Sequence, residues 1–310
     1  MLTAVTVLAL VPATATAASA ATTGAATTDA VTASGGRYTT IDVPGAAATV
    51  ATGVNDLGTI VGIATDSSGL DHGFLYRGGT FTAINVPGAP QTLAASVNDL
   101  GVVVGYSLDA NGAAHGFVDR AGTFAAVNDP NAGSASGQGT FAANMNNLGV
   151  IAGFYLDANG VQHGFIDRAG TFTTVNAPAA GSASGQGTSV GWINDLGEVT
   201  GAYTEPDGDE VAFAGPLGRF TAVSDPNAPP VSTLTAAIND AGVVVGTWFD
   251  ASGNSHGFTE RGGVFTPVTD PSAGADGTSP QGISNTGAVV GLYFDASGAV
   301  HGFELNPARP

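Results

Sequence analysis

A segment of 43 to 48 residues recurs six times in this chain, and the repetition limits the possible folds more than any other feature. Equivalent positions are Tyr38, Phe81, Phe124, Phe172, Phe220 and Phe265, which lie 43, 43, 48, 48 and 45 residues apart. A chain that repeats at a fixed period builds one supersecondary unit per repeat and buries its core between neighbouring units. We therefore expect residues 38–310 to form a single repeat domain.

Each repeat has the turn and strand pattern of a four-stranded antiparallel sheet. An N-D-x-G turn, an apolar run ending in glycine, a D-x-x-G turn, a His-Gly-Phe unit and a further glycine turn follow in that order. Stretches such as GVVVGYSLD and TFAAVNDP are rich in β-branched and aromatic residues, which favour strands. Glycine at the end of each turn suits a backbone with positive φ. We name the four expected strands A to D.

Six such units predict an all-β fold, a six-bladed β-propeller of four-stranded antiparallel blades around a central channel. The ordered region begins with a lone strand D at 38–44 and ends after strands A, B and C of the sixth unit. We therefore expect the N-terminal strand to close the last blade. A β-sandwich is the weaker alternative, because it gives no reason for near-identical copies.

The repeated N-D-x-G, V-x-G, D-x-x-G and HGF pattern resembles the probable extracellular HAF-repeat family, named for a His-Ala-Phe tripeptide. The resemblance covers residues 38–303. Glycine replaces the alanine in five units, and the fourth reads Val211-Ala212-Phe213, which keeps the alanine and lacks the histidine. The resemblance implies secretion and a repeat architecture, and it brings no site residues with it.

The N-terminal segment predicts export. Residues 1–20 form an apolar stretch that ends in Ala18-Ser19-Ala20, an A-x-A pattern typical of a signal peptide cleavage site. No basic residue precedes the apolar stretch, which departs from the usual signal peptide, so a disordered Ala/Thr tail is the alternative. Residues 21–37 predict a flexible Ala/Thr-rich lead-in. We expect a secreted, extracellular protein.

The composition excludes several classes of partner. The formal net charge is −18, with no lysine, and cysteine is absent. An acidic surface repels phosphate backbones and anionic lipids, and no apolar run reaches the roughly 20 residues of a membrane span. We therefore predict no nucleic-acid partner, no membrane span and no thiol chemistry. We expect a monomer whose partner is an extracellular glycan or protein.

The recurring histidines are candidates for a metal site or for a structural role. Equivalent positions in neighbouring blades are too far apart to share a zinc ion, which needs nitrogens at about 2.0–2.1 Å. Buried polar side chains need hydrogen-bond partners. We therefore interpret the histidines as structural residues that form hydrogen bonds across blade contacts: His72, His115, His163, His256 and His301.

The fourth repeat departs from the others at its D-x-x-G turn, which reads EPDGDEVAF. It places Glu205, Asp207, Asp209 and Glu210 on and beside one turn and removes the histidine. Close carboxylates repel one another unless they are solvated or share a cation, and Ca²⁺ takes about six to eight oxygen ligands. The four residues are therefore a candidate calcium site, with a solvated acidic turn as the alternative. The sequence requires no other cofactor.

Two classes of function remain open. The first is a secreted, non-enzymatic binding module that uses the face carrying the B–C turns and D–A loops. The second is an extracellular carboxylate-dependent hydrolase or lyase, with or without calcium, at the channel mouth. A propeller hosts both, so the fold cannot decide between them. We favour binding, because catalysis needs one unit to supply an acid and a base that the other units lack.

Overall fold

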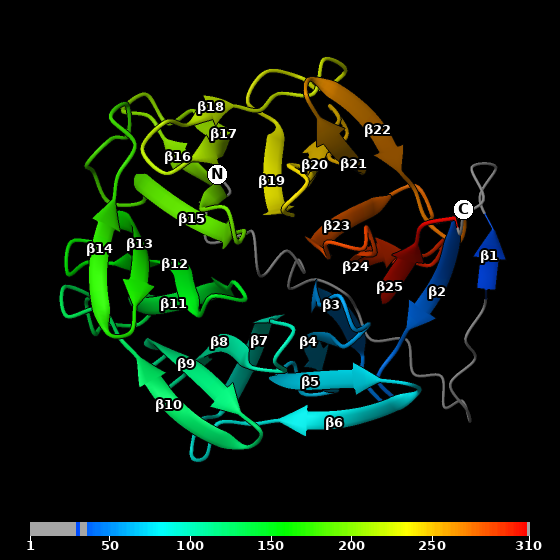
Figure 1. The fold of residues 1–310 in the computed structure, drawn as a ribbon, viewed down its shortest axis with the longest axis horizontal. Coiled ribbons are helices and arrows are strands. Elements are labelled where there is room, and N and C mark those ends of the chain that lie inside the picture. The colour runs from blue at the N-terminus through cyan, green and yellow to red at the C-terminus, as the bar shows by residue number, and fades with distance from the viewer. Residues whose placement is uncertain (1–28, 32–35, 309–310) are drawn as a thin grey trace.

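The computed structural model describes residues 29–31 and 36–308, and these residues form an all-β structure. Six antiparallel blades with four strands each surround a central axis (Figure 1), and single parallel bridges, Ala114 to Gly139 and Gln162 to Gly187, join blades 2 to 4 into one continuous sheet. The predicted six-bladed fold is therefore confirmed. Within the described ranges, no helix has the length and the apolar character that a membrane crossing would need.

The strands follow the predicted order A, B, C and D in every blade. Blade 1 contains β3 (Ala48–Val54), β4 (Ile60–Thr65), β5 (Asp71–Arg77) and β6 (Thr80–Ile84). Blade 2 contains β7 (Gln91–Val97), β8 (Val103–Leu108), β9 (Ala114–Arg120) and β10 (Thr123–Val127). Blade 3 contains β11 (Gly139–Met145), β12 (Val150–Leu156), β13 (Gln162–Arg168) and β14 (Thr171–Val175). Blades 4 and 5 contain β15 (Gly187–Ile193), β16 (Glu198–Thr204), β17 (Glu210–Pro216) and β18 (Thr221–Ala222); and β19 (Thr233–Ile238), β20 (Val244–Phe249), β21 (Ser255–Arg261) and β22 (Val264–Val268). Blade 6 contains β23 (Thr278–Ile283), β24 (Val289–Phe294), β25 (Val300–Asn306) and the N-terminal β2 (Arg37–Ile41).

The two ends of the chain meet in blade 6, as the repeat pattern predicts. β2 pairs antiparallel with β25, with Tyr38 opposite Leu305 and Ile41 opposite Gly302. Tyr38 and Ile41 are buried, and the Tyr38 ring lies 5.6 Å from the Phe303 ring. The N-terminal strand therefore supplies both backbone pairing and core side chains to the last blade.

One short strand was not expected. β1 (Asp29–Val31) pairs antiparallel with β2 and adds a fifth strand to blade 6, within the segment predicted to be a flexible lead-in. The pairing has a physical reason, because β2 would otherwise present unpaired backbone groups at a sheet edge. The predicted signal peptide, 1–20, lies outside the described residues.

The His-Gly-Phe unit contributes mainly to the core. The phenylalanine of each unit covers the glycine of the V-x-G motif on strand B: a Cβ on Gly62 would collide with the carbonyl oxygen of Val50 and with the Phe74 ring. The fourth unit keeps this arrangement, because Phe213 is buried over Gly201. The strand B glycine and the strand C phenylalanine therefore recur together, because the ring occupies the space that a Cβ on strand B would fill.

Candidate functional site

The central channel contains an apolar cavity. Its empty volume is about 650 Å³, including space open to solvent. Every blade contributes to the lining, which contains no charged side chain: Thr52, Tyr106, Phe141, Ala142, Ala143, Phe154, Ser189, Gly191, Trp192, Gly201, Thr235, Ala236 and Gln281. A concave apolar site with a few polar groups is the usual form of a small-molecule site. The cavity is therefore the main candidate site.

The cavity exists because the repetition fails between blades 3 and 4. At the preceding boundary, Tyr106 of strand B packs edge-on against Phe141 of the next strand A, with ring centroids 4.9 Å apart. The equivalent pair at the following boundary is Phe154 and Ser189. Serine is much smaller than phenylalanine, so it leaves space, and Phe154 remains partly exposed.

Two features make the cavity wall aromatic. The Phe141 and Phe154 rings stack, with centroids 4.7 Å apart and an interplanar angle of 10°. Trp192 lies on β15 directly after Gly191, where a bulge shifts the pairing register with β16. The other five units have small or polar residues at the tryptophan position: Gly53, Ser96, Asn144, Ala237 and Gly282. Trp192 is therefore a specific addition to one unit.

The threonine and serine hydroxyl groups of the lining already have protein partners. Thr52 Oγ1 donates to the carbonyl oxygen of Ala94 at 2.8 Å, and Thr235 Oγ1 donates to that of Gly201 at 2.9 Å. These bonds join neighbouring blades, because the partners lie on different sheets. These bonds leave the partly exposed aromatic faces of Phe154 and Trp192 as the main surface available to a ligand.

In blades 1 to 5, the asparagine that begins the A–B turn links neighbouring blades, whereas blade 6 has Ser284 there, which bonds within its own turn. Asn55 Oδ1 accepts the backbone N–H groups of Leu57 and Thr59, and Asn55 Nδ2 donates to the carbonyl oxygen of Asn98 at 2.9 Å. Asn98, Asn146, Asn194 and Asn239 donate in the same way to the carbonyl oxygen of the next turn. The sequence showed the turn and did not show this contact between blades.

The second residue of each turn forms a closed circle, which we call the mouth ring: Asp56, Asp99, Asn147, Asp195, Asp240 and Asn285. Each backbone N–H donates to the side-chain Oδ1 of the next member, at 2.6 to 2.9 Å. The bond from Asn285 to Asp56 joins blade 6 to blade 1. A hollow of about 390 Å³, including open solvent, lies inside the ring, and Trp192 lines both this hollow and the apolar cavity.

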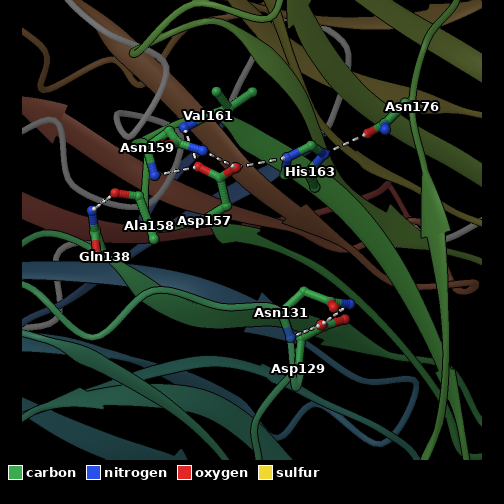
Figure 2. Close-up of polar contacts among 9 residues, drawn as sticks. All are labelled: Asp129, Asn131, Gln138, Asp157, Ala158, Asn159, Val161, His163 and Asn176. Atoms are coloured by element: carbon green, nitrogen blue, oxygen red, sulfur yellow. Dashed lines mark hydrogen bonds and ion pairs between the residues drawn. The ribbon is translucent and has the colours of Figure 1, made fainter.

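The histidines form hydrogen bonds within their own blades, so the predicted bonding across blade contacts is wrong. In blade 3, Asp157 caps the B–C turn by accepting the N–H groups of Asn159 and Val161 (Figure 2). His163 forms its hydrogen bond with Asn176 of the same blade, Nδ1 to Oδ1 at 3.3 Å, and its Nε2 lies 3.7 Å from Asp157 Oδ2. The same pairing recurs in the other four units that have a histidine, with N–O distances of 3.0 to 3.4 Å. The hairpin brings the histidine back beside the aspartate six residues earlier. The histidine side chains are 23–49% exposed, and their structural role stays a prediction.

His301 has an additional partner that connects the two ends of the chain. Its Nδ1 lies 2.8 Å from Oδ2 of Asp42, the residue that follows β2. Its Nε2 lies 3.4 Å from Asp295 Oδ2. The hydrogen bond with Asp42 is the main reason that the pKa of His301 is raised. The electrostatics of this residue therefore depend on the closure of blade 6.

The structure does not assemble the predicted calcium site at Glu205, Asp207, Asp209 and Glu210. Asp207 and Asp209 are exposed, whereas one carboxylate oxygen of Glu210 is buried without a hydrogen-bond partner, and burial raises the pKa of Glu210. Among the described residues, no three His, Asp or Glu side chains are grouped so that they could hold a metal ion. Calcium binding at this turn stays a prediction without support from the geometry.

Comparisons with known proteins yield similar folds at low sequence identity. No family model and no curated protein matches the chain, so the resemblance to the HAF-repeat family stays a prediction. The Aleuria aurantia lectin, a six-bladed β-propeller with a fucose recognition mode, is 12% identical over 87% of this chain and 99% of its own, with a TM-score of 0.48. A lectin from Burkholderia pseudomallei is 11% identical over 91% and 93%, with a TM-score of 0.49. The propeller domain of the Trilobed protease from Pyrococcus furiosus is 9% identical over 84% and 93%, with a TM-score of 0.47.

Proposed function

We propose that this propeller is a secreted binding module that takes a small neutral ligand with an apolar face into the channel cavity. The observation that carries the proposal is the aromatic wall formed by Phe154 of blade 3 and Trp192 of blade 4, both partly exposed, with a tryptophan at this position in one of the six units. Apolar pockets with few polar groups are the usual sites for such ligands. The distant lectin similarities transfer no ligand, and the proposal does not depend on them.

The chemistry of the lining supports binding over catalysis at this position. General acid–base catalysis needs a positioned titratable side chain. The lining contains no Asp, Glu, His or Lys, and its one titratable side chain is Tyr106, whose pKa is raised by burial. A ring-shaped ligand with C–H groups on one face, such as a pyranose, matches flat aromatic walls. Glycans are therefore the first ligand class to test.

We place the entrance at the face with the B–C turns and D–A loops, because the N-D-x-G turns form the continuous mouth ring at the other face. The glycine-rich loop after β10 bridges two blades on the entrance side: Gly137 N–H donates to the carbonyl oxygen of Gly112, and Gly133 N–H to that of Leu156. Such loops are suited to extend the site around a larger glycan.

Intrinsic fluorescence offers a direct test, because the chain has only two tryptophans, Trp192 and Trp248. Trp248 stacks on His256 outside the cavity, with centroids 4.0 Å apart. In a Trp248→Phe background, we expect glycans selected on an array to change the emission of Trp192 with saturation. Ser189→Phe restores the large residue of the equivalent position in blade 3, so it should fill the cavity and abolish the signal while the protein stays folded.

The control is Trp248→Ala in the natural chain, which removes an aromatic residue of the same kind at a site away from the cavity. Its glycan affinity should stay unchanged, whereas Trp192→Ala should lose about tenfold, or roughly 1.4 kcal/mol. Binding that survives both Ser189→Phe and Trp192→Ala would place the ligand elsewhere. An array without any ligand dependent on these residues would refute the proposal.

A further inference from the structure

Four leucines project into solvent at the same turn position of consecutive blades. They are the third residues of the N-D-L-G or N-N-L-G turns in blades 1 to 4, and their exposure ranges from 62% to 79%: Leu57, Leu100, Leu148 and Leu196. We call this set the leucine arc. Of the eight large hydrophobic side chains that are exposed in the described residues, four belong to it.

The turn itself does not require leucine. Blades 5 and 6 have Ala241 and Thr286 at the same position. The N–H of Ala241 donates to Asn239 Oδ1 at 3.1 Å, and the N–H of Leu100 donates to Asn98 Oδ1 at the same distance. The leucine side chains are therefore dispensable for the local fold. Exposed apolar residues that gather on one face often mark an interaction surface.

The leucine arc borders an acidic centre. Each leucine directly follows a member of the mouth ring, four of whose members are aspartates: Asp56, Asp99, Asp195 and Asp240. The residues that line the hollow inside the ring include no lysine, arginine or histidine. This face therefore combines an apolar rim with a concentration of negative charge at the channel axis.

We propose that this face docks a basic amphipathic peptide segment of a partner protein. Its apolar side chains would cover the leucine arc, and a lysine or arginine would enter the mouth ring, where the carboxylates give electrostatic complementarity. A second copy of this chain is a poorer occupant, because two acidic rings would face each other. The same carboxylates would repel an anionic membrane. This surface lies on the face opposite the proposed ligand entrance, and the two linings share one residue, Trp192, which the tests below leave unchanged.

The aspartates allow a charge test that keeps the ring geometry. Asp56 and Asp240 each accept the backbone N–H of a neighbouring mouth-ring residue through Oδ1, as Asn147 and Asn285 do. Asp56→Asn with Asp240→Asn therefore removes two charges and retains an acceptor. Asp207→Asn with Asp209→Asn is the matched control, because it removes two charges from an exposed turn at the other face.

The leucines allow an equally conservative change. Leu100→Ala with Leu148→Thr introduces the residues that blades 5 and 6 already use, and Leu70→Ala is the control on a B–C turn. Thermal unfolding of every variant shows whether the fold is retained. The probe is the acetylated and amidated peptide LRALLRALLRAL, which places leucines on one helical face with arginines beside them, and LEALLEALLEAL is its acidic counterpart.

In isothermal titration calorimetry, we expect the arginine peptide to bind, with affinity that falls as salt is added, and the glutamate peptide not to bind. Each test double variant should weaken binding by about tenfold, as expected for central interface residues, and the controls should not. Equal binding by test and control variants, or no binding of the arginine peptide, would overturn the proposal. Two other outcomes, each without peptide binding, would assign the face to a different occupant. Sedimentation with phosphatidylcholine vesicles that depends on the leucines would indicate a membrane. Dimers in analytical ultracentrifugation that depend on the leucines would indicate a second copy of the chain.

Discussion

Removal of the N-terminal strand should destabilise the whole propeller. A truncation that begins at residue 45 removes β2 and therefore the buried side chains of Tyr38 and Ile41, and it exposes β25 as a sheet edge. Full burial of a large apolar side chain contributes about 1.5–3 kcal/mol, so these two side chains alone account for roughly 3–6 kcal/mol. Typical domain stability is about 5–15 kcal/mol. The truncated protein should therefore be at or near the limit of folding.

Urea unfolding followed by circular dichroism measures the effect, with a second truncation that begins at residue 36 as the control. The control removes β1 and keeps β2, so its midpoint should lie close to that of the full chain. A synthetic peptide with the sequence of residues 36–46 should restore part of the lost stability in trans by pairing with β25. If the two truncated proteins unfold at the same urea concentration, our account of the ring closure is incorrect.

Two further predictions concern single residues. Gly105→Ala should destabilise the protein by about 1–3 kcal/mol in urea unfolding, as overpacking does, because the added Cβ would collide with the carbonyl oxygen of Leu93. Gly191→Ala should be tolerated, because its Cβ would have no atom nearer than 3.6 Å. Equal effects of the two substitutions would disprove the packing argument. The pKa of His301 is raised in the folded state, so its contribution is complete below the unfolded pKa of about 6.5 and is lost as the pH rises through the higher folded value. The melting temperature of the natural chain should therefore exceed that of His301→Ala by more at about pH 5.5 than at about pH 8; a gap independent of pH would contradict this assignment.

The period of the sequence predicts the blades, because strands A, B and C each end at a turn that contains glycine. The closure of blade 6 was also predictable, since the chain starts with a lone strand D and ends with strands A to C. The role of Asn55 between blades was not, because a turn residue looks the same whether its free amide faces water or the next blade. The same limit applies to His163, whose partner depends on the side-chain direction at a hairpin.

The candidate site was less accessible to sequence reasoning. The cavity arises from the combination of Phe154 on one blade with Ser189 on the next, and no single repeat shows which positions face each other across a boundary. Trp192 is visible in the sequence as a departure from the repeat. Its place on the channel wall depends on the bulge in β15, which a strict period of two does not reveal. Departures from repetition are therefore better guides to a site than the repeated motifs.

The mouth ring has a consequence for how this protein can evolve. Asn and Asp side chains both present the oxygen that accepts the neighbouring N–H, so a change to asparagine at Asp56 or Asp240 leaves the backbone arrangement of the ring available. Each exchange nevertheless alters the charge at the channel axis by one unit. Selection can therefore adjust the electrostatic character of this opening in small increments, one blade at a time, while the architecture that holds the blades together remains constant.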